Sequence, residues 1–390
     1  MKPSRALPVI IGSQFACTSL WFAGNAVVDD LALKTGMGQE IVGYLISSVQ
    51  LGFITGTLLF ALLMVADRYS PSRVFMVCAL LAALCNLTLL VDPISVTLLL
   101  GARFGTGFFL AGVYPVGMKI AADYYEKGLG KALGWLVGAL VLGTALPYFI
   151  SGTSWGRSYA SVVLTTSCLS VLGGILLWFL VPDGPFRKPS IRLQLKAGAF
   201  LFKIQGFRKA AFGYFGHMWE LYAFWAFTPF AVQTYNSFSE TQFSVPIVTG
   251  SIIGLGAFSC VVGGMASQFW GSKKVATTAL LVSGCFCLLS PLIFSLSPYL
   301  FLCAWGLWGM AVTADSPQFS NQVAAAVPSE LKGTALTIVN CLGFAISIVS
   351  IQLLAVLVEI VEPRYLFLAL SAGPVLGLIS SIGKSAMSIR

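Results

Sequence analysis

The chain of 390 residues is 57% hydrophobic and only 9% charged, with a formal net charge of +9. A soluble domain usually has about 25% charged residues, so this composition excludes a water-soluble globular protein and requires lipid as the surrounding medium. The basic residues gather between long apolar runs, which predicts contact with anionic membrane lipid and argues against a nucleic-acid partner.

Twelve apolar runs of roughly 20 residues, the length of a membrane-spanning helix, follow one another along the chain. They lack the two-residue alternation of barrel strands, so helices are predicted. The first six begin near Leu7, Ile41, Val74, Ser95, Leu129 and Ser158, and the second six begin near Phe207, Ser244, Val275, Tyr299, Gly333 and Pro363. We therefore predict an all-α membrane protein with twelve transmembrane helices in two six-helix bundles, residues 1–182 and 207–390, joined by a basic linker, 183–206.

Lysine and arginine in the loops predict the orientation of the chain. If both termini lie on one side, the opposite face carries only Lys34, Arg157 and Arg364. The other face collects the basic linker together with Lys2, Arg5, Arg68, Arg73, Lys127, Lys131, Lys273, Lys274, Lys332, Lys384 and Arg390. Because positive loops stay in the cytoplasm, both termini are predicted to be cytoplasmic, in a multi-pass protein of the cytoplasmic (inner) membrane.

The two halves of the sequence repeat each other. The fourth run reads RFGTGFFLAGVYP and the tenth reads WGLWGMAVTADSP. An offset of 202 residues aligns Arg103 with Trp305, Gly107 with Gly309, and Pro115 with Pro317. Duplicated six-helix halves are typical of secondary transporters, whose substrate site lies between the halves near the middle of the membrane.

The loop after the second run, ADRYSPSR from Ala66 to Arg73, resembles the loop motif G-x-x-x-D-R-x-G-R-K of the major facilitator superfamily. Three residues match the motif, namely Asp67, Arg68 and Arg73. The resemblance extends over essentially the whole chain and implies a transporter that works by alternating access. It also implies that these three residues form a conformational latch. The alternative is that the arginines only mark the topology.

Two further helices carry parts of that family's motifs. In the fourth run, the pattern R-x-x-x-G-x-x-x-A-x-x-x-P is met by Arg103, Gly107, Ala111 and Pro115, and its small residues permit close helix approach. The fifth run resembles the family's antiporter motif at Gly134, Gly138, Gly143 and Pro147. Leu146 replaces the glycine expected before the proline, which weakens the implied export function, and helix packing alone is the alternative.

The seventh run contains the only histidine of the chain, His217, and a glutamate three residues later, Glu220. His217 lies about ten residues into the run, ~15 Å deep at 1.5 Å per residue. A charge at that depth is costly, so such groups tend to face a cavity or a partner. We predict that Glu220 is the main proton site, that His217 tunes it or contacts substrate, and that Asp315 and Arg103 contribute to coupling. The alternative is a His217–Glu220 hydrogen bond or a Glu220–Arg103 ion pair that only braces helices.

Polar and aromatic side chains predict where a solute binds. In the first run a polar stripe on one helix face consists of Gln14, Thr18, Trp21 and Asn25. Gln318 shares a face with Asp315, and aromatic walls are predicted from Tyr114, Tyr222 and Trp225. The alternative for the stripe is hydrogen bonding between helices, and for the aromatic residues packing or an interfacial belt.

The sequence does not support an ATP-driven, metal-dependent or enzymatic function. No ATP-binding loop, zinc motif or serine-based catalytic signature is present, and the nine cysteines lie in apolar runs without metal-ligand spacing. We therefore predict no enzyme activity, no cofactor and no metal, and a monomer whose partners are a small-molecule substrate, protons and membrane lipid. A membrane sensor of the same fold is the non-transporting alternative.

A proton-coupled transporter for a cationic, zwitterionic or amphipathic solute is the leading prediction, with export by antiport slightly ahead of import by symport of an organic solute or anion. The chain also resembles bacterial members grouped with nitrate and cyanate porters. Its second and eighth runs lack the arginines of nitrate porters, which argues against nitrate.

Overall fold

The computed structural model describes residues 3–125, 129–187 and 193–382, and all regular structure in these ranges is helical. Of the basic residues used to predict orientation, Lys2, Lys127, Lys188, Arg192, Lys384 and Arg390 lie outside the described residues. The elements up to the linker are α1 (Pro3–Thr18), η1 (Asn25–Val27), α2 (Val28–Thr35), α3 (Ile41–Leu62), α4 (Val65–Arg68), α5 (Pro71–Leu87), η2 (Thr88–Leu90), α6 (Val96–Leu110), α7 (Tyr114–Tyr124), α8 (Leu129–Ser151), η3 (Trp155–Arg157) and α9 (Tyr159–Leu180).

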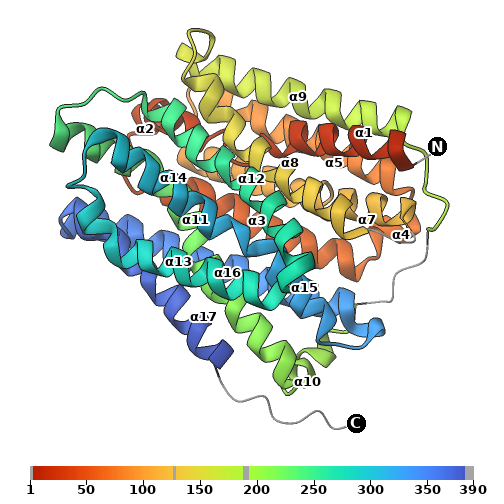
Figure 1. Ribbon diagram of the computed structural model, residues 1–390. Coiled ribbons are helices and arrows are strands. Elements are labelled where there is room, and N and C mark those ends of the chain that lie inside the picture. The colour runs from red at the N-terminus through yellow and green to blue at the C-terminus, as the bar shows by residue number, and fades with distance from the viewer. Residues whose placement is uncertain (1–2, 126–128, 188–192, 383–390) are drawn as a thin grey trace.

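The elements from the linker onward are η4 (Leu195–Ala197), α10 (Gly198–Leu201), α11 (Gln205–Ser239), α12 (Val245–Trp270), α13 (Ser272–Ile293), α14 (Pro298–Ala314), α15 (Ser316–Ala325), η5 (Ser329–Leu331), α16 (Lys332–Ile360), η6 (Pro363–Ser371) and α17 (Ala372–Ile382). Long helices run beside one another through the molecule, and the short helix α10 lies at one end of it (Figure 1).

Nine of the predicted runs form helices that, among the described residues, are long and apolar enough to cross a membrane. The other three predicted runs are helical but differ from these nine. The first ends as α1 at Thr18, the tenth ends as α14 at Ala314 after 17 residues, and the seventh, α11, is rich in polar and aromatic residues over its 35 residues. These three runs hold most of the predicted proton and solute residues. The multi-pass membrane fold is confirmed, while the count of twelve and the side of the termini stay predictions.

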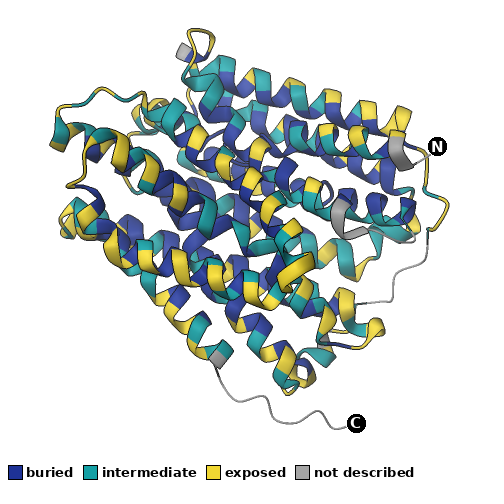
Figure 2. Ribbon diagram, viewed as in Figure 1, coloured by how far each residue is buried: buried dark blue, intermediate teal, exposed yellow. Residues whose placement is uncertain are grey.

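The outer faces of the helices are apolar, as lipid contact requires. Phe179 of α9 is 69% exposed, Leu292 of α13 is 65% exposed and Ile379 of α17 is 62% exposed. Exposed residues follow the outer edges of the bundle, while buried residues lie where helices face one another (Figure 2). A soluble monomer rarely exposes so many large apolar side chains, so the surface itself indicates a membrane protein.

The predicted repeat is visible in the helix boundaries. α6 begins at residue 96 and α14 at residue 298, and α7 begins at residue 114 and α15 at residue 316, an offset of 202 in both cases. Pro115 and Pro317 each occupy the first turn of the second helix of the pair, where the missing N–H costs nothing. Each half therefore has one helix that is broken at the same place.

Helices from the two predicted halves meet along two seams, α8 with α12 and α3 with α16. Within the first half, α3 and α6 approach closely because glycines face each other's backbone. A Cβ at Gly107 would lie 1.8 Å from the carbonyl oxygen of Val49. This contact agrees with the predicted role of the small residues in the fourth run. The division into residues 1–182, 183–206 and 207–390 remains a prediction.

Candidate functional site

The four predicted ionisable residues, Arg103, His217, Glu220 and Asp315, are all fully buried. They do not form one cluster. His217 contacts Asp315, Glu220 contacts residues of α13 and α14, and Arg103 contacts the broken first run. Each residue therefore has its own environment, and each environment suggests a different role.

Glu220 accepts hydrogen bonds on both carboxylate oxygens. The Trp308 indole N–H donates to Oε1 at 2.6 Å, the Cys287 thiol donates to Oε1 at 3.3 Å, and the Ser283 hydroxyl donates to Oε2 at 2.8 Å. All three donors are fully buried. The carboxylate is thus satisfied inside the second half, between α11, α13 and α14, and the predicted Glu220–Arg103 or Glu220–His217 contact is not found.

His217 and Asp315 form the buried pair that sequence analysis did not predict. Nδ1 of His217 lies 2.7 Å from Oδ1 of Asp315, a distance typical of an ion pair, although the contact lacks the alignment of a hydrogen bond. The second histidine nitrogen and the second carboxylate oxygen have no hydrogen-bond partner among the described residues. Buried polar groups are normally satisfied, so this pair is an exception that calls for a water, proton or solute partner.

Asp315 lies at the break between α14 and α15, where it precedes the first residue of α15. A residue in this position usually accepts a hydrogen bond from a backbone N–H of the following turn. The Asp315 side chain makes no such bond and turns instead toward His217 of α11. The break therefore presents a carboxylate at the positive end of a helix, in contact with the only histidine.

Arg103 stabilises the break in the first run. Its Nη2 donates to the carbonyl oxygens of Leu20 at 3.1 Å and Trp21 at 2.6 Å, and its Nη1 donates to Oδ1 of Asn86 at 3.2 Å. Leu20 and Trp21 follow the end of α1, where carbonyl groups lack helical partners. The guanidinium supplies those partners through Nη2 and binds Asn86 through Nη1, while its buried Nε–H has no hydrogen-bond partner among the described residues. No ion pair of the described residues includes it.

An aromatic cluster joins the two predicted halves at the centre of the molecule. We define it as Trp21, Phe53, Tyr222, Trp225 and Phe344. The ring centroids of Trp21 and Tyr222 are 5.9 Å apart and stacked, and those of Phe53 and Phe344 are 4.9 Å apart. The indole N–H groups of Trp21 and Trp225 have no hydrogen-bond partner among the described residues. The cluster packs the two halves against each other yet retains donors that a solute could use.

The residues of the polar stripe in the first run have different hydrogen-bond partners. Both side-chain polar atoms of Gln14 are buried without a partner among the described residues, and the Thr18 hydroxyl donates to the Gln14 carbonyl oxygen at 2.8 Å. Asn25 lies beyond the break and donates to the Val42 carbonyl oxygen at 3.4 Å. Gln14, Trp21 and the Oδ1 atom of Asn25 therefore have unused polar groups, whereas the Thr18 hydroxyl binds backbone.

Two further predicted solute residues lie beside the helix breaks. Gln318 is buried in α15, and its Oε1 atom has no hydrogen-bond partner among the described residues. Tyr114, the first residue of α7, is half-buried. Both residues thus lie within one turn of a break, one in each half.

Sequence analysis did not predict a polar seam between α3 and α16. The Ser347 hydroxyl donates to Oε1 of Gln50 at 3.1 Å, and Nε2 of Gln352 donates to the Ser47 hydroxyl at 2.8 Å. The two hydrogen-bonded pairs lie one after the other along two helices that are far apart in the sequence. The available signal was the pair of polar residues in each run, three residues apart in the second run and five apart in the eleventh. In the predicted orientation the seam closes the outer side of the aromatic cluster.

The predicted latch residue Asp67 pairs with a lysine of the fourth run. Lys119 of α7 lies 2.7 Å from Oδ1 of Asp67. Arg187 of the linker donates to the backbone oxygens of Asp67 and Tyr69 and pairs with Asp183 at 2.7 Å. Arg68 and Arg73 are exposed and belong to none of the ion pairs within the described ranges. The contacts of this loop thus involve Lys119 and Arg187, which sequence analysis did not single out.

Comparison with known structures identifies the fold. The human organic anion transporter MFSD10 (TETRAN) superposes with a TM-score of 0.74 at 15% identity, covering 98% of this chain and 100% of that chain. A variant of the nucleoside transporter NupG gives 0.72 at 14% identity, covering 97% and 99%. The E. coli fucose:proton symporter FucP gives 0.67 at 12% identity, covering 99% and 100%. At these identities the similarity shows a shared fold.

Comparison at the level of sequence identifies the family. No curated protein sequence matches the chain. The family model of the Major Facilitator Superfamily, in contrast, matches residues 9–210, slightly more than half of the chain. The chain therefore belongs to the major facilitator superfamily, and this membership confirms the predicted resemblance and the prediction of a transporter in place of an enzyme.

Proposed function

We propose that this transporter couples the movement of a small solute to protons by alternating access, and that His217 and Asp315 form the proton site. The supporting observation is their contact of 2.7 Å in a fully buried setting at the α14–α15 break. The pair brings an acid and a base, each able to take up a proton, into direct contact, whereas Glu220 and Arg103 contact neither each other nor His217. The pair also has unused atoms for a third partner.

The chemistry of the pair supports coupling. A charged carboxylate in an apolar interior costs several kcal/mol unless it is neutralised. Protonated His217 or a proton on Asp315 can neutralise it, and so can a cationic group of a solute. Proton and cationic solute then compete for Asp315, and only one of them needs to occupy the site at a time. Such competition drives exchange of solute for proton when the site opens to each side in turn.

The surroundings favour a cationic, zwitterionic or amphipathic solute with an apolar part. The aromatic cluster offers faces for cation–π contact and the unpaired indole donors of Trp21 and Trp225. Arg103 already directs its Nη1 and Nη2 groups to protein oxygens, which leaves only its buried Nε–H without a partner among the described residues. We therefore favour export by antiport over import. The bias of basic residues in the loops supports a location in the cytoplasmic membrane.

Import by proton symport of an organic solute or anion is the second candidate. The observation in its favour is structural similarity to a protein described as a fucose:proton symporter and to another described as an organic anion transporter. In this case a proton on Asp315 would travel with the solute instead of against it.

The test begins with a thermal-shift screen of amino acids, organic cations, carboxylates and sugars on the purified protein, because a ligand of the folded state raises its stability. A solute found this way is then added to proteoliposomes that contain a pH-sensitive dye. We expect a solute gradient to drive proton movement in the unaltered protein, but not in Asp315→Asn or His217→Gln. The control is Asn321→Ala, an exposed position on the same helix α15.

The direction of proton movement separates the two candidates. Protons that move against the solute indicate antiport, and protons that move with it indicate symport. Proton movement that is unchanged in both Asp315→Asn and His217→Gln would show that the pair is not the proton site.

A further inference from the structure

An apolar groove opens on the outer surface of the second half, and its lining reaches Ala314, the residue before Asp315. It has a volume of about 470 Å³ and runs between α12, α13 and α14. Small side chains form its floor, because Gly263, Ala266, Ala279 and Ala311 leave space where larger residues would pack. The groove is therefore open to the lipid that surrounds the helices.

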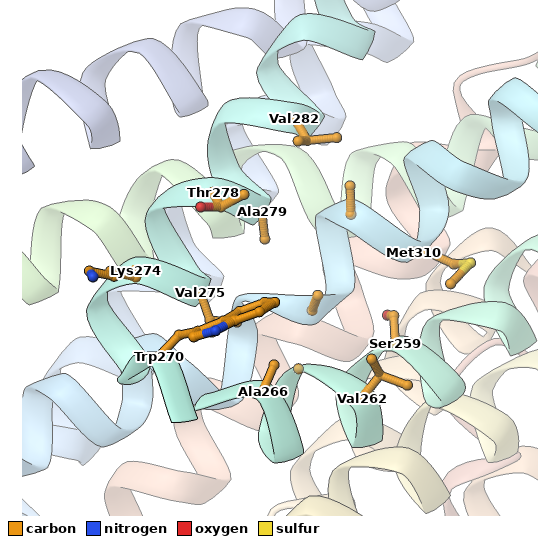
Figure 3. Close-up of a pocket in the computed structure, with 13 residues that line it drawn as sticks. Ser259, Val262, Ala266, Trp270, Lys274, Val275, Thr278, Ala279, Val282 and Met310 are labelled. Atoms are coloured by element: carbon orange, nitrogen blue, oxygen red, sulfur yellow. The ribbon is translucent and has the colours of Figure 1, made fainter. Parts of the chain in front are cut away.

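One end of the groove is cationic and aromatic. Lys274 and Trp270 line this end, while Val282 and Met310 lie toward the other (Figure 3). Trp270 is 68% exposed, and Lys273, the residue before Lys274, is exposed as well. Exposed tryptophan and lysine are typical of the level of lipid headgroups. In the predicted orientation this end lies on the cytoplasmic side.

The lysines have no acidic partner in the groove or its turn. No aspartate or glutamate lines the groove, and neither lysine belongs to an ion pair of the described residues. The corresponding loop of the first half differs, because there Asp67 pairs with Lys119. Aligned on the loop motif, Gln268 stands 201 residues after Asp67, at the corresponding position of the second half, and carries no charge. The turn between α12 and α13 thus lacks the anion that its first-half counterpart contains.

We propose that this groove binds an anionic phospholipid, with an acyl chain between the three helices and the phosphate at Lys273 and Lys274. The acyl chain gains little free energy when it moves from the bilayer into the groove, since lipid tails are as apolar as the groove. Selectivity must therefore come from the headgroup and the two lysines. Each lysine attracts an anionic headgroup by about 1 kcal/mol, so the two lysines together should give a preference of about 30-fold over a zwitterionic lipid.

Quenching of Trp270 fluorescence tests the site directly. The protein is reconstituted in phosphatidylcholine that contains increasing fractions of phosphatidylglycerol with brominated acyl chains, which quench nearby tryptophan. The chain has nine tryptophans, so the Trp270 signal is taken as the difference from Trp270→Phe. A 30-fold preference places half-maximal quenching at about 3% phosphatidylglycerol, whereas no preference places it at about 50%.

Two variants separate the lysines from general surface charge. Lys273→Gln together with Lys274→Gln should move the midpoint toward 50%. The control, Lys196→Gln together with Lys203→Gln, removes the same charge from exposed linker positions and should leave the midpoint unchanged. An unaltered protein with a midpoint near 50%, or an equal shift in the control pair, would overturn the proposal.

A third variant tests the groove itself. Ala279→Phe fills the space between the helices and keeps both lysines, so it should also weaken the preference. A preference that survives this change would mean that surface lysines alone attract the lipid, and the groove would not be a site. These measurements contain no transport step, so their outcome is independent of the proposed proton coupling.

Discussion

Replacement of Glu220 distinguishes between the two assignments of the proton site. Sequence analysis favours Glu220, whereas the structure places it among Ser283, Cys287 and Trp308. Glutamine has nearly the same shape. Its carbonyl oxygen can accept from the Trp308 indole, and its amide can donate to Ser283, whose hydroxyl can turn to the Leu280 carbonyl oxygen at 3.2 Å. Glu220→Gln should therefore cost only about 1 kcal/mol, the difference between a charged and a neutral acceptor.

Glu220→Ala should be far more costly, because it leaves the Trp308 N–H unpaired and opens a cavity. These two effects amount to about 4 kcal/mol. For 390 residues the entropy of unfolding is about 0.8 kcal/mol/K. The midpoint of thermal unfolding should thus fall by about 1 °C in Glu220→Gln and about 5 °C in Glu220→Ala.

The decisive assay combines that melting temperature with solute-driven proton movement in proteoliposomes. We expect Glu220→Gln to retain proton movement at nearly normal stability, while Asp315→Asn loses it. If Glu220→Gln abolishes proton movement with a midpoint within about 2 °C of the unaltered protein, Glu220 carries the proton and the structural reasoning is refuted.

Three further predictions concern helix packing and the loop contacts. Gly107→Ala should lower the melting temperature strongly, because its Cβ would meet the Val49 backbone, whereas Gly101→Ala, with open space around it, should not. Arg103→Leu should lower the melting temperature by about 5 °C, since three charge-assisted hydrogen bonds are lost; an unchanged value would contradict its role at the helix break. Arg187→Gln should change the transport rate with a melting shift of only about 1 °C, because its ion pair is partly exposed. An unaltered rate would show that Arg187 is no part of a latch.

Helix positions were predictable because membrane burial requires long apolar runs and internal hydrogen bonds. The matched prolines at residues 115 and 317 also predicted the repeat, and each lies in the first turn after a break. The break after Thr18 was not predictable from the first run alone, because the buried carbonyl groups that it leaves without helical partners are satisfied by Arg103 of the fourth run. The partner of His217 was missed for the same reason, since sequence spacing places only Glu220 nearby.

The two halves share the geometry of the break but differ in its chemistry. In the second half, Asp315 is the residue before α15. In the first half, the corresponding residue before α7 is Val113. A break between such helices thus folds without an acid, which supports the proposal that Asp315 serves coupling and not the fold. Asp315→Val should then keep the helical structure at a cost of about 2 kcal/mol, from the loss of the buried contact with His217, and lose proton movement entirely. A variant that fails to fold would show that the acid is structural, and one that still moves protons would place the proton site elsewhere.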